Sequence, residues 1–257
     1  MPAEARDREE CYRDLRACDQ ALPATRRSDE PRPADVGGRW KWKGLELDPE
    51  ANRIADEGLA ARQAAEGRDA DGNYGERGLT PGMRRIEAEL EHGTLVPDTE
   101  KLALKSPDRF KEKLAKMISL EPDVAPAGHA AKIHDGIRYT FIFADQFYAA
   151  GVRDTENRLV DHGYKLVGRK PSWLGEEYKG INSQWRDADS GQLFEVQFHT
   201  PASWDAKQRT HDSYEKIQNL ATKPEERARL RTYQREIVAS VPIPPGALEF
   251  APYKEGI

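Results

Sequence analysis

Two segments near the end of the chain alternate apolar and polar residues with a period of two. The first covers residues 178–186 and the second residues 193–200, with Asp-Ser-Gly at 189–191 between them. This alternation is typical of half-buried strands, and a short polar segment with glycine favours a tight turn. We therefore expect a β-hairpin.

The two faces of this hairpin differ in chemistry. The apolar face carries Ile181, Trp185, Phe194, Val196 and Phe198. The opposite face carries Tyr178, Gly180, Asn182, Gln184, Arg186, Glu195, Gln197 and His199. A carboxylate, amides, an imidazole, a guanidinium and a phenol thus share one face. That face is either a binding surface or the ordinary polar exterior of an edge hairpin.

The remaining pattern predicts helices and two further strands. Helices are expected over residues 49–66, from Thr80, from Pro107, over 146–162, from Pro201 and from Pro224. Residues 133–143 and 164–167 read as strands, and residues 168–177 as a loop. The chain before residue 95 is expected to be mainly helical, with an irregular arm over 23–38 and two tryptophans, Trp40 and Trp42, that dock on the body.

The composition of the chain limits the classes of function that it can have. Hydrophobic residues make up 37% of the 257 residues and charged residues 33%. No apolar run approaches the roughly 18 residues of a membrane-spanning helix, so we expect none. The net charge of -5 argues against general nucleic-acid binding. Residues 101–120, however, hold six basic and two acidic residues, a local charge of +4, which makes this segment the place to look for phosphates.

The basic segment coincides with a predicted helix start. Ser106 or Asp108 can cap a helix that begins at Pro107, and Arg109 and Lys113 lie on one stripe of it. A helix N-terminus with lysines around it favours phosphate binding. The alternative, which is commoner for such a stripe, is a basic face that is exposed to solvent and binds nothing.

Four motifs together resemble the RelA/SpoT-type alarmone synthetases. Residues 195–200 (Glu-Val-Gln-Phe-His-Thr) resemble their Glu-x-Gln-x-x-Thr strand, and residues 178–182 resemble their Gly-Tyr-x-Ser-x-His segment. Residues 105–107 (Lys-Ser-Pro) with Lys113 resemble the segment that holds the ATP phosphates. Residues 135–138 (Asp-Gly-Ile-Arg) resemble Asp-x-x-Gly-x-Arg. The likeness covers about residues 103–220.

This resemblance implies a fold and a domain plan. It implies an α+β fold, with a mixed sheet of about five strands flanked by helices, related to nucleotidyltransferases. We expect a mainly helical N-terminal extension over residues 1–95, a catalytic domain over 96–241 and an extended tail over 242–257. A monomer is expected.

The resemblance also implies an activity, the transfer of the β,γ-pyrophosphate of ATP to the 3′-hydroxyl of a purine nucleotide, with release of AMP. The ATP-binding residues would be Lys105, Ser106, Arg109 and Lys113. Asp135, Arg138 and Glu195 would be catalytic, with Asp135 and Glu195 holding Mg²⁺, or Mn²⁺ or Co²⁺ in its place. The acceptor-binding residues would be Lys170, Tyr178, Asn182, Gln184 and Gln197.

The chain departs from the family pattern at several positions. Ala103 stands where an arginine is usual, Asp135 lies three rather than five residues before Arg138, and Asn182 replaces a histidine. Residues 176–177 are Glu-Glu in place of Asn-Gly, which favours a less selective purine acceptor that includes adenine nucleotides. The alternatives are a toxin that pyrophosphorylates the tRNA 3′ end and a catalytically silent nucleotide-binding module.

The sequence leaves two cellular locations open for the protein. A synthetase-only chain of this size resembles secreted stand-alone pyrophosphokinases, which implies a mature extracellular form without its leader; the alternative is cytoplasmic. On one helix Cys11 and Cys18 would lie about 10 Å apart, too far for a disulfide, but a break between them would allow one.

Overall fold

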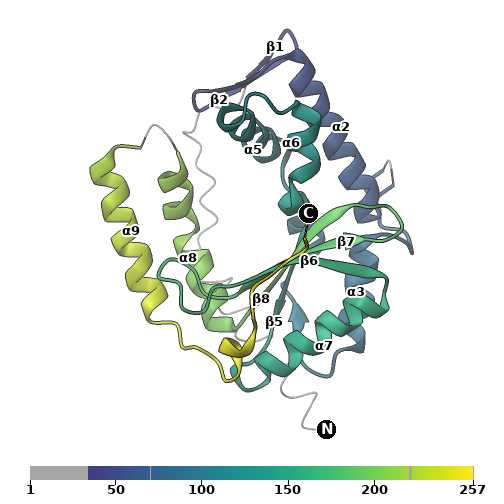
Figure 1. Ribbon diagram of the computed structural model, residues 1–257, viewed down its shortest axis with the longest axis vertical. Coiled ribbons are helices and arrows are strands. Elements are labelled where there is room, and N and C mark those ends of the chain that lie inside the picture. Colours follow the sequence, from purple (N-terminus) through teal and green to yellow (C-terminus); the bar gives the residue numbers. More distant parts are fainter. Residues whose placement is uncertain (1–33, 70, 220–221, 257) are drawn as a thin grey trace.

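The computed structural model describes residues 34–69, 71–219 and 222–256 (Figure 1). Cys11, Cys18 and the helix expected near the N-terminus lie outside the described residues. A central sheet is flanked on one side by α8 and α9, and α2, α5 and α6 form a separate group (Figure 1). No described helix combines the length and the apolar character needed to span a bilayer.

The α-helices are α2 Pro49–Glu66, α3 Leu79–Glu89, α4 Thr99–Leu102, α5 Pro107–Leu120, α6 Pro126–Lys132, α7 Tyr148–Asp161, α8 Pro201–Gln218 and α9 Pro224–Ala239. Three short 3₁₀ helices are η1 His134–Gly136, η2 Asp145–Phe147 and η3 Ala247–Glu249. The strands are β1 Ala34–Val36, β2 Arg39–Trp42, β3 Leu45–Leu47, β4 Thr94–Leu95, β5 Arg138–Ile142, β6 Tyr164–Pro171, β7 Ile181–Asp187, β8 Leu193–His199 and β9 Tyr253–Lys254.

The predicted hairpin forms the middle of a six-stranded mixed sheet. Its strand order is β4-β5-β8-β7-β6-β9, and only β5 and β8 are parallel neighbours. Asn182 lies opposite Gln197 and Gln184 opposite Glu195 across the β7–β8 pair. The α+β class is thus confirmed. The sheet has six strands rather than about five, because two short strands, β4 and β9, pair along the edges of the four that the sequence predicts.

Two large hydrophobic cores lie within the described residues, and a small third cluster joins Val96, Ile142 and Trp204. The larger contains the apolar face of the hairpin and packs against α3 and α7; the smaller joins α2, α5, α6 and the β1–β3 sheet. In the smaller core Phe110 and Leu114 of α5 are fully buried. The larger core therefore covers one face of the main sheet and leaves the polar face of β8 for chemistry.

The small antiparallel β1–β3 sheet was not predicted from the sequence. Buried Trp40 lies on β2, and its Nε1 donates to Asp108 Oδ1 at 3.2 Å. Trp42 is half-buried and meets Trp40 edge-on. The expected docking of the two tryptophans is confirmed, and it anchors the first turn of α5.

Two predicted strands have different bounds in the structure. The strand expected over residues 133–143 begins only at Arg138, because His134–Gly136 forms η1. The strand expected to stop at residue 167 continues to Pro171 past an irregularity between Leu166 and Gly168. Pairing with β7 stabilises this continuation, which local sequence signals cannot report.

The last two helices each leave a tyrosine exposed. In α8, Ile217 is buried but His211 and Tyr214 are exposed. In α9, Gln234 and Val238 are buried, whereas Tyr233 is exposed. Both helices pack chiefly against one another, so their apolar side chains need not face the sheet.

Candidate active site

The site lies where β5 and β8 run parallel. Arg138, the first residue of β5, stands in register with Glu195 of β8. Arg138 Nε donates to Glu195 Oε1 at 2.8 Å, and its Nη2 lies 3.3 Å from Asp135 Oδ2. One guanidinium thus joins the two carboxylates that the sequence had singled out.

Asp135 reaches this place through a turn rather than along a strand. On a continuous strand, Asp135 would share the face of Ile137 and Tyr139, both buried in the core. The 3₁₀ turn of η1 instead turns its carboxylate towards Arg138, which belongs to the other face. The prediction of one strand over residues 133–143 is therefore wrong at Asp135, because the backbone is not extended there.

Two lysines complete the group around Asp135. Lys113 Nζ donates to Asp135 Oδ1 at 2.6 Å, and Lys105 Nζ lies 3.2 Å from Oδ2. Lys113 comes from α5, whereas Lys105 lies in the segment between α4 and α5. The Lys105 backbone N–H donates to the Gly136 carbonyl at 2.9 Å, which holds that segment against the turn that carries Asp135. We call Lys105, Lys113, Asp135, Arg138 and Glu195 the charged cluster.

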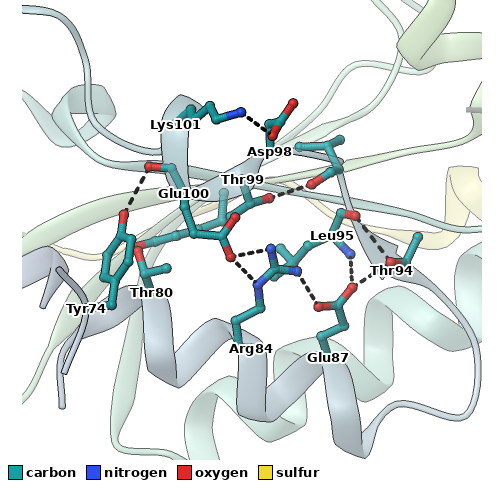
Figure 2. A network of polar contacts seen from close by, with 12 residues as sticks. Tyr74, Thr80, Arg84, Glu87, Thr94, Leu95, Asp98, Thr99, Glu100 and Lys101 are labelled. Atoms are coloured by element: carbon teal, nitrogen blue, oxygen red, sulfur yellow. Dashed lines mark hydrogen bonds and ion pairs between the residues drawn. The ribbon is translucent and has the colours of Figure 1, made fainter. Parts of the chain in front are cut away.

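A polar network anchors the segment that leads to Lys105 (Figure 2). Arg84 on α3 pairs with Glu100 on α4, and its Nη1 lies 2.8 Å from Glu87 Oε2. Glu87 Oε1 also accepts from the Leu95 N–H at 2.8 Å, and Tyr74 Oη donates to the Glu100 carbonyl at 3.0 Å. This network stabilises α4 and, through it, the approach to the charged cluster.

Glu195 is almost fully buried and uses its two oxygens differently. Oε1 accepts from Arg138 and, at 2.6 Å, from Gln197 Nε2. Oε2 lies 3.7 Å from His134 Nε2, beyond hydrogen-bond distance. His134 itself contacts Gln184, with 3.0 Å between Gln184 Nε2 and His134 Nε2. Oε2 therefore keeps capacity to accept a hydrogen bond from a ligand.

The charged cluster has an excess of positive charge. Three cationic side chains face two carboxylates, which leaves a net charge of +1. Burial would raise the pKa of Asp135, but Lys105 and Lys113 hold it well below its usual range. Burial lowers the pKa of Lys105, and Asp135 partly offsets this. Such an arrangement suits an anionic ligand that brings more negative charge.

Tyr178 and Asn182 form a second polar group on the same side of the sheet. Tyr178 Oη donates to Asn182 Oδ1 at 2.6 Å and lies 2.9 Å from His199 Nε2, while His199 Nδ1 lies 2.8 Å from Ser203 Oγ. Burial raises the pKa of Tyr178 and lowers that of His199, so both are neutral at pH 7.

Sequence reasoning missed Lys207 on α8. Its Nζ donates to Gln197 Oε1 at 2.5 Å, which orients the Gln197 amide so that Nε2 faces Glu195. Burial lowers the pKa of Lys207 to about 7, and Arg138 adds to the effect. A signal was present: Lys207 lies one helical turn after Ser203, on the face that a helix begun at Thr200 turns towards the sheet.

The other predicted residues lie around the charged cluster rather than in it. Arg109 pairs with Glu112, at 2.9 Å, and with Glu215 of α8, and its guanidinium lies over Trp42. Ser106 is exposed at the start of α5. Lys170 is exposed on β6 opposite Asn182.

The donor set fits Mg²⁺. Asp135 is held ionised, and Glu195 keeps an oxygen free of hydrogen bonds to the described side chains. Across the described ranges, no group of three or more His, Cys, Asp or Glu side chains could form an all-protein metal cage. Mg²⁺ is commonly held by one or two carboxylates together with substrate phosphates and water, so two carboxylates suffice.

Comparisons with known proteins found similar solved structures. No protein-family model and no curated protein matches the chain. Among solved structures, small alarmone synthetase 1 from Bacillus subtilis matches at 12% identity, covering 75% of this chain and 92% of that one, with a TM-score of 0.45. A GTP pyrophosphokinase family protein from Streptococcus pneumoniae matches at 13% identity, covering 75% and 89%, with a TM-score of 0.46.

A Type VI effector in complex with its immunity protein matches at 17% identity, covering 76% of this chain and 99% of that one, with a TM-score of 0.40.

Proposed function

We propose that the protein transfers the β,γ-pyrophosphate of ATP to the 3′-hydroxyl of a purine nucleotide. The observation that carries the proposal is the charged cluster, in which three cations surround two carboxylates at the start of two parallel strands. Transfer of a phosphoryl group requires positioned cations, a divalent metal and an activated nucleophile, and the cluster can supply the first and hold the second.

On the donor side, Lys105 and Lys113 bind the triphosphate. In the absence of a ligand both lysines pair with Asp135. This pairing holds their ammonium groups beside the carboxylate where a metal–nucleotide complex would bind. Arg138 lies between the two carboxylates and stabilises negative charge on the transferred group. The beginning of α5, at Pro107, adds the partial positive charge of a helix N-terminus.

On the acceptor side, Glu195 acts as the general base. Its Oε2 takes the proton of the 3′-hydroxyl while the 3′-oxygen bonds to the β-phosphorus, the bond from that phosphorus to the α,β-bridging oxygen breaks, and AMP leaves. Gln197 and Arg138 fix Oε1, so the orientation of the carboxylate is set before the acceptor arrives. Tyr178 and Asn182 contact the acceptor nucleotide.

Asp135 and Glu195 would hold Mg²⁺. When bound, the ion neutralises phosphate charge and polarises the phosphorus that is attacked.

The acceptor is a purine without strict preference for guanine. Glu176 and Glu177, which replace the family's Asn-Gly, lie near arginines of α9: Glu176 Oε2 is 3.3 Å from Arg235 Nε, and Glu177 Oε1 is 4.0 Å from Arg231 Nε. Carboxylates that pair with α9 thus stand in place of the family's Asn-Gly, and this departure supports adenine nucleotides as acceptors.

The test is an incubation of the protein with Mg²⁺ and ATP, alone and with ADP, AMP, GTP or GDP, followed by anion-exchange separation. AMP and a 3′-pyrophosphorylated nucleotide are expected, and Glu195→Gln should lose turnover while keeping its circular-dichroism spectrum. Absence of AMP with every small acceptor would refute the proposal. AMP formed only when tRNA is added would identify tRNA as the acceptor. Nucleotide binding without any turnover would indicate a silent binding module.

A further inference from the structure

One cation beside the charged cluster has no carboxylate partner. Lys207 is half-buried; its ammonium donates to the neutral Gln197 amide and lies 4.4 Å from the centroid of the Trp204 ring. Lys105 and Lys113, by contrast, pair with Asp135. No carboxylate within the described ranges lies at ion-pair distance from Lys207.

A charge withdrawn from water without an opposite charge is unfavourable for folding. Burial and Arg138 on β5 both disfavour the charged form of Lys207, and Glu195 on β8 only partly compensates. Neutral His199, also on β8, adds no negative charge. The bond to Gln197 orients that amide but supplies no opposite charge, so the position of Lys207 beside the cluster indicates an anionic ligand.

Lys207 lies on a different side of Glu195 from the other two lysines. Asp135 precedes β5, whose first residue stands beside Glu195, so Lys105 and Lys113 gather at the start of the parallel pair. Gln197, the partner of Lys207, lies two residues further along β8, a distance of about 7 Å. Gln197 also stands opposite Asn182, on the acceptor side.

We propose that Lys207 is a second phosphate-binding residue, whose ammonium leaves the Gln197 carbonyl oxygen to bind a phosphate oxygen on the acceptor side of Glu195. The inference rests on the proposed function and names a ligand for a residue outside the motifs. Two sources present this chemistry, a 5′-phosphate of the acceptor nucleotide and the pyrophosphoryl group in transit.

The first test does not depend on turnover. The pKa of Lys207 is measured by NMR on protein with isotope-labelled lysine, the signal being assigned by its loss in Lys207→Met, before and after addition of inorganic pyrophosphate or ADP. A bound phosphate oxygen should raise this pKa, because it favours the charged amine. Lys207→Met should weaken binding about 10- to 100-fold, as for loss of a charge-assisted hydrogen bond.

Matched variants separate a ligand role from a structural one. Lys216→Met, nine residues further along α8 and so about 13 Å away, should bind pyrophosphate and ADP like the wild type. Lys207→Arg should keep most of the affinity. The proposal is overturned if neither pyrophosphate nor ADP moves the pKa of Lys207. It is also overturned if Lys207→Met has a lower Tm but binds both probes with unchanged affinity. Neither outcome depends on whether the protein has pyrophosphokinase activity.

Where turnover is found, kinetics identify the source of the phosphate. A higher KM for the acceptor with unchanged kcat in Lys207→Met assigns the 5′-phosphate, and a lower kcat with unchanged KM assigns the transferred group. Wild-type values of both constants in Lys207→Met would count against any role in binding phosphate.

Discussion

Asp135→Asn tests the central electrostatic feature of the site. The Asp135 side chain is 12% exposed and faces Lys113 at 2.6 Å, Lys105 at 3.2 Å and Arg138 at 3.3 Å. Asparagine keeps the shape of the side chain and removes its charge. Three cations then lose the carboxylate that they share, although Arg138 keeps its contact with Glu195.

The size of the effect follows from burial. Removing one partner of a buried ion pair costs about 3–5 kcal/mol. The three cations are between 20% and 34% exposed, so solvent screens them and we expect a loss nearer to about 2 kcal/mol. For a chain of this size, each kcal/mol shifts Tm by about 2–4 °C, which predicts a fall of about 4–8 °C.

The effect should also depend on pH in a defined direction. The folded-state pKa of Asp135 is held well below the unfolded value of about 3.9, so its contribution is complete above that value. It is lost as the pH falls towards the folded-state pKa. The Tm difference between wild type and Asp135→Asn should therefore be full at neutral pH and shrink in acid.

The assay is thermal denaturation followed by circular dichroism at low ionic strength, with Asp154→Asn as the control. Asp154 makes one partly exposed pair with Arg158 one turn along α7, and its loss should cost about 0.5 kcal/mol. Inorganic pyrophosphate should restore stability more in Asp135→Asn than in the wild type, because it replaces the missing anion. Equal Tm values for wild type and Asp135→Asn at neutral pH would refute the reasoning.

Two further predictions concern α8. Arg109 and Glu215 link α5 to α8, and a double-mutant cycle on urea unfolding should show a coupling of up to about 1 kcal/mol that decreases with salt. Burial opposes ionisation, but the pairing with His211 and Arg109 lowers the pKa of Glu215 to about 2, so the coupling should be complete above about pH 5 and weaken as the pH falls; a coupling independent of both salt and pH would contradict this account. Thr200→Ala removes the cap of α8, where Thr200 Oγ1 accepts from the Ser203 N–H, and should cost about 1 kcal/mol of unfolding free energy. Thr232→Ala, exposed within α9, is its control and should change stability by less than about 0.5 kcal/mol.

The sequence by itself determined the local elements whose signals lie within a few residues. Asp48 as N-cap and Gly67 as C-cap bound α2 where predicted, because capping depends on side chains next to the helix end. The alternation in residues 193–199 placed Glu195 and Gln197 on the face opposite Phe194 and Phe198, since strand geometry leaves no other choice.

Only the tertiary structure decided which of these residues meet. Asp135 joins Arg138 through a 3₁₀ turn held by the backbone of Lys105, a contact between segments about 30 residues apart. Lys207 belongs to the site because α8 packs over the polar face of β8, a relation that no local period encodes. Arg109, although one turn from Lys113, pairs with Glu215 instead of Asp135. Spacing along the chain fixes the face of an element, whereas long-range packing sets what that face contacts.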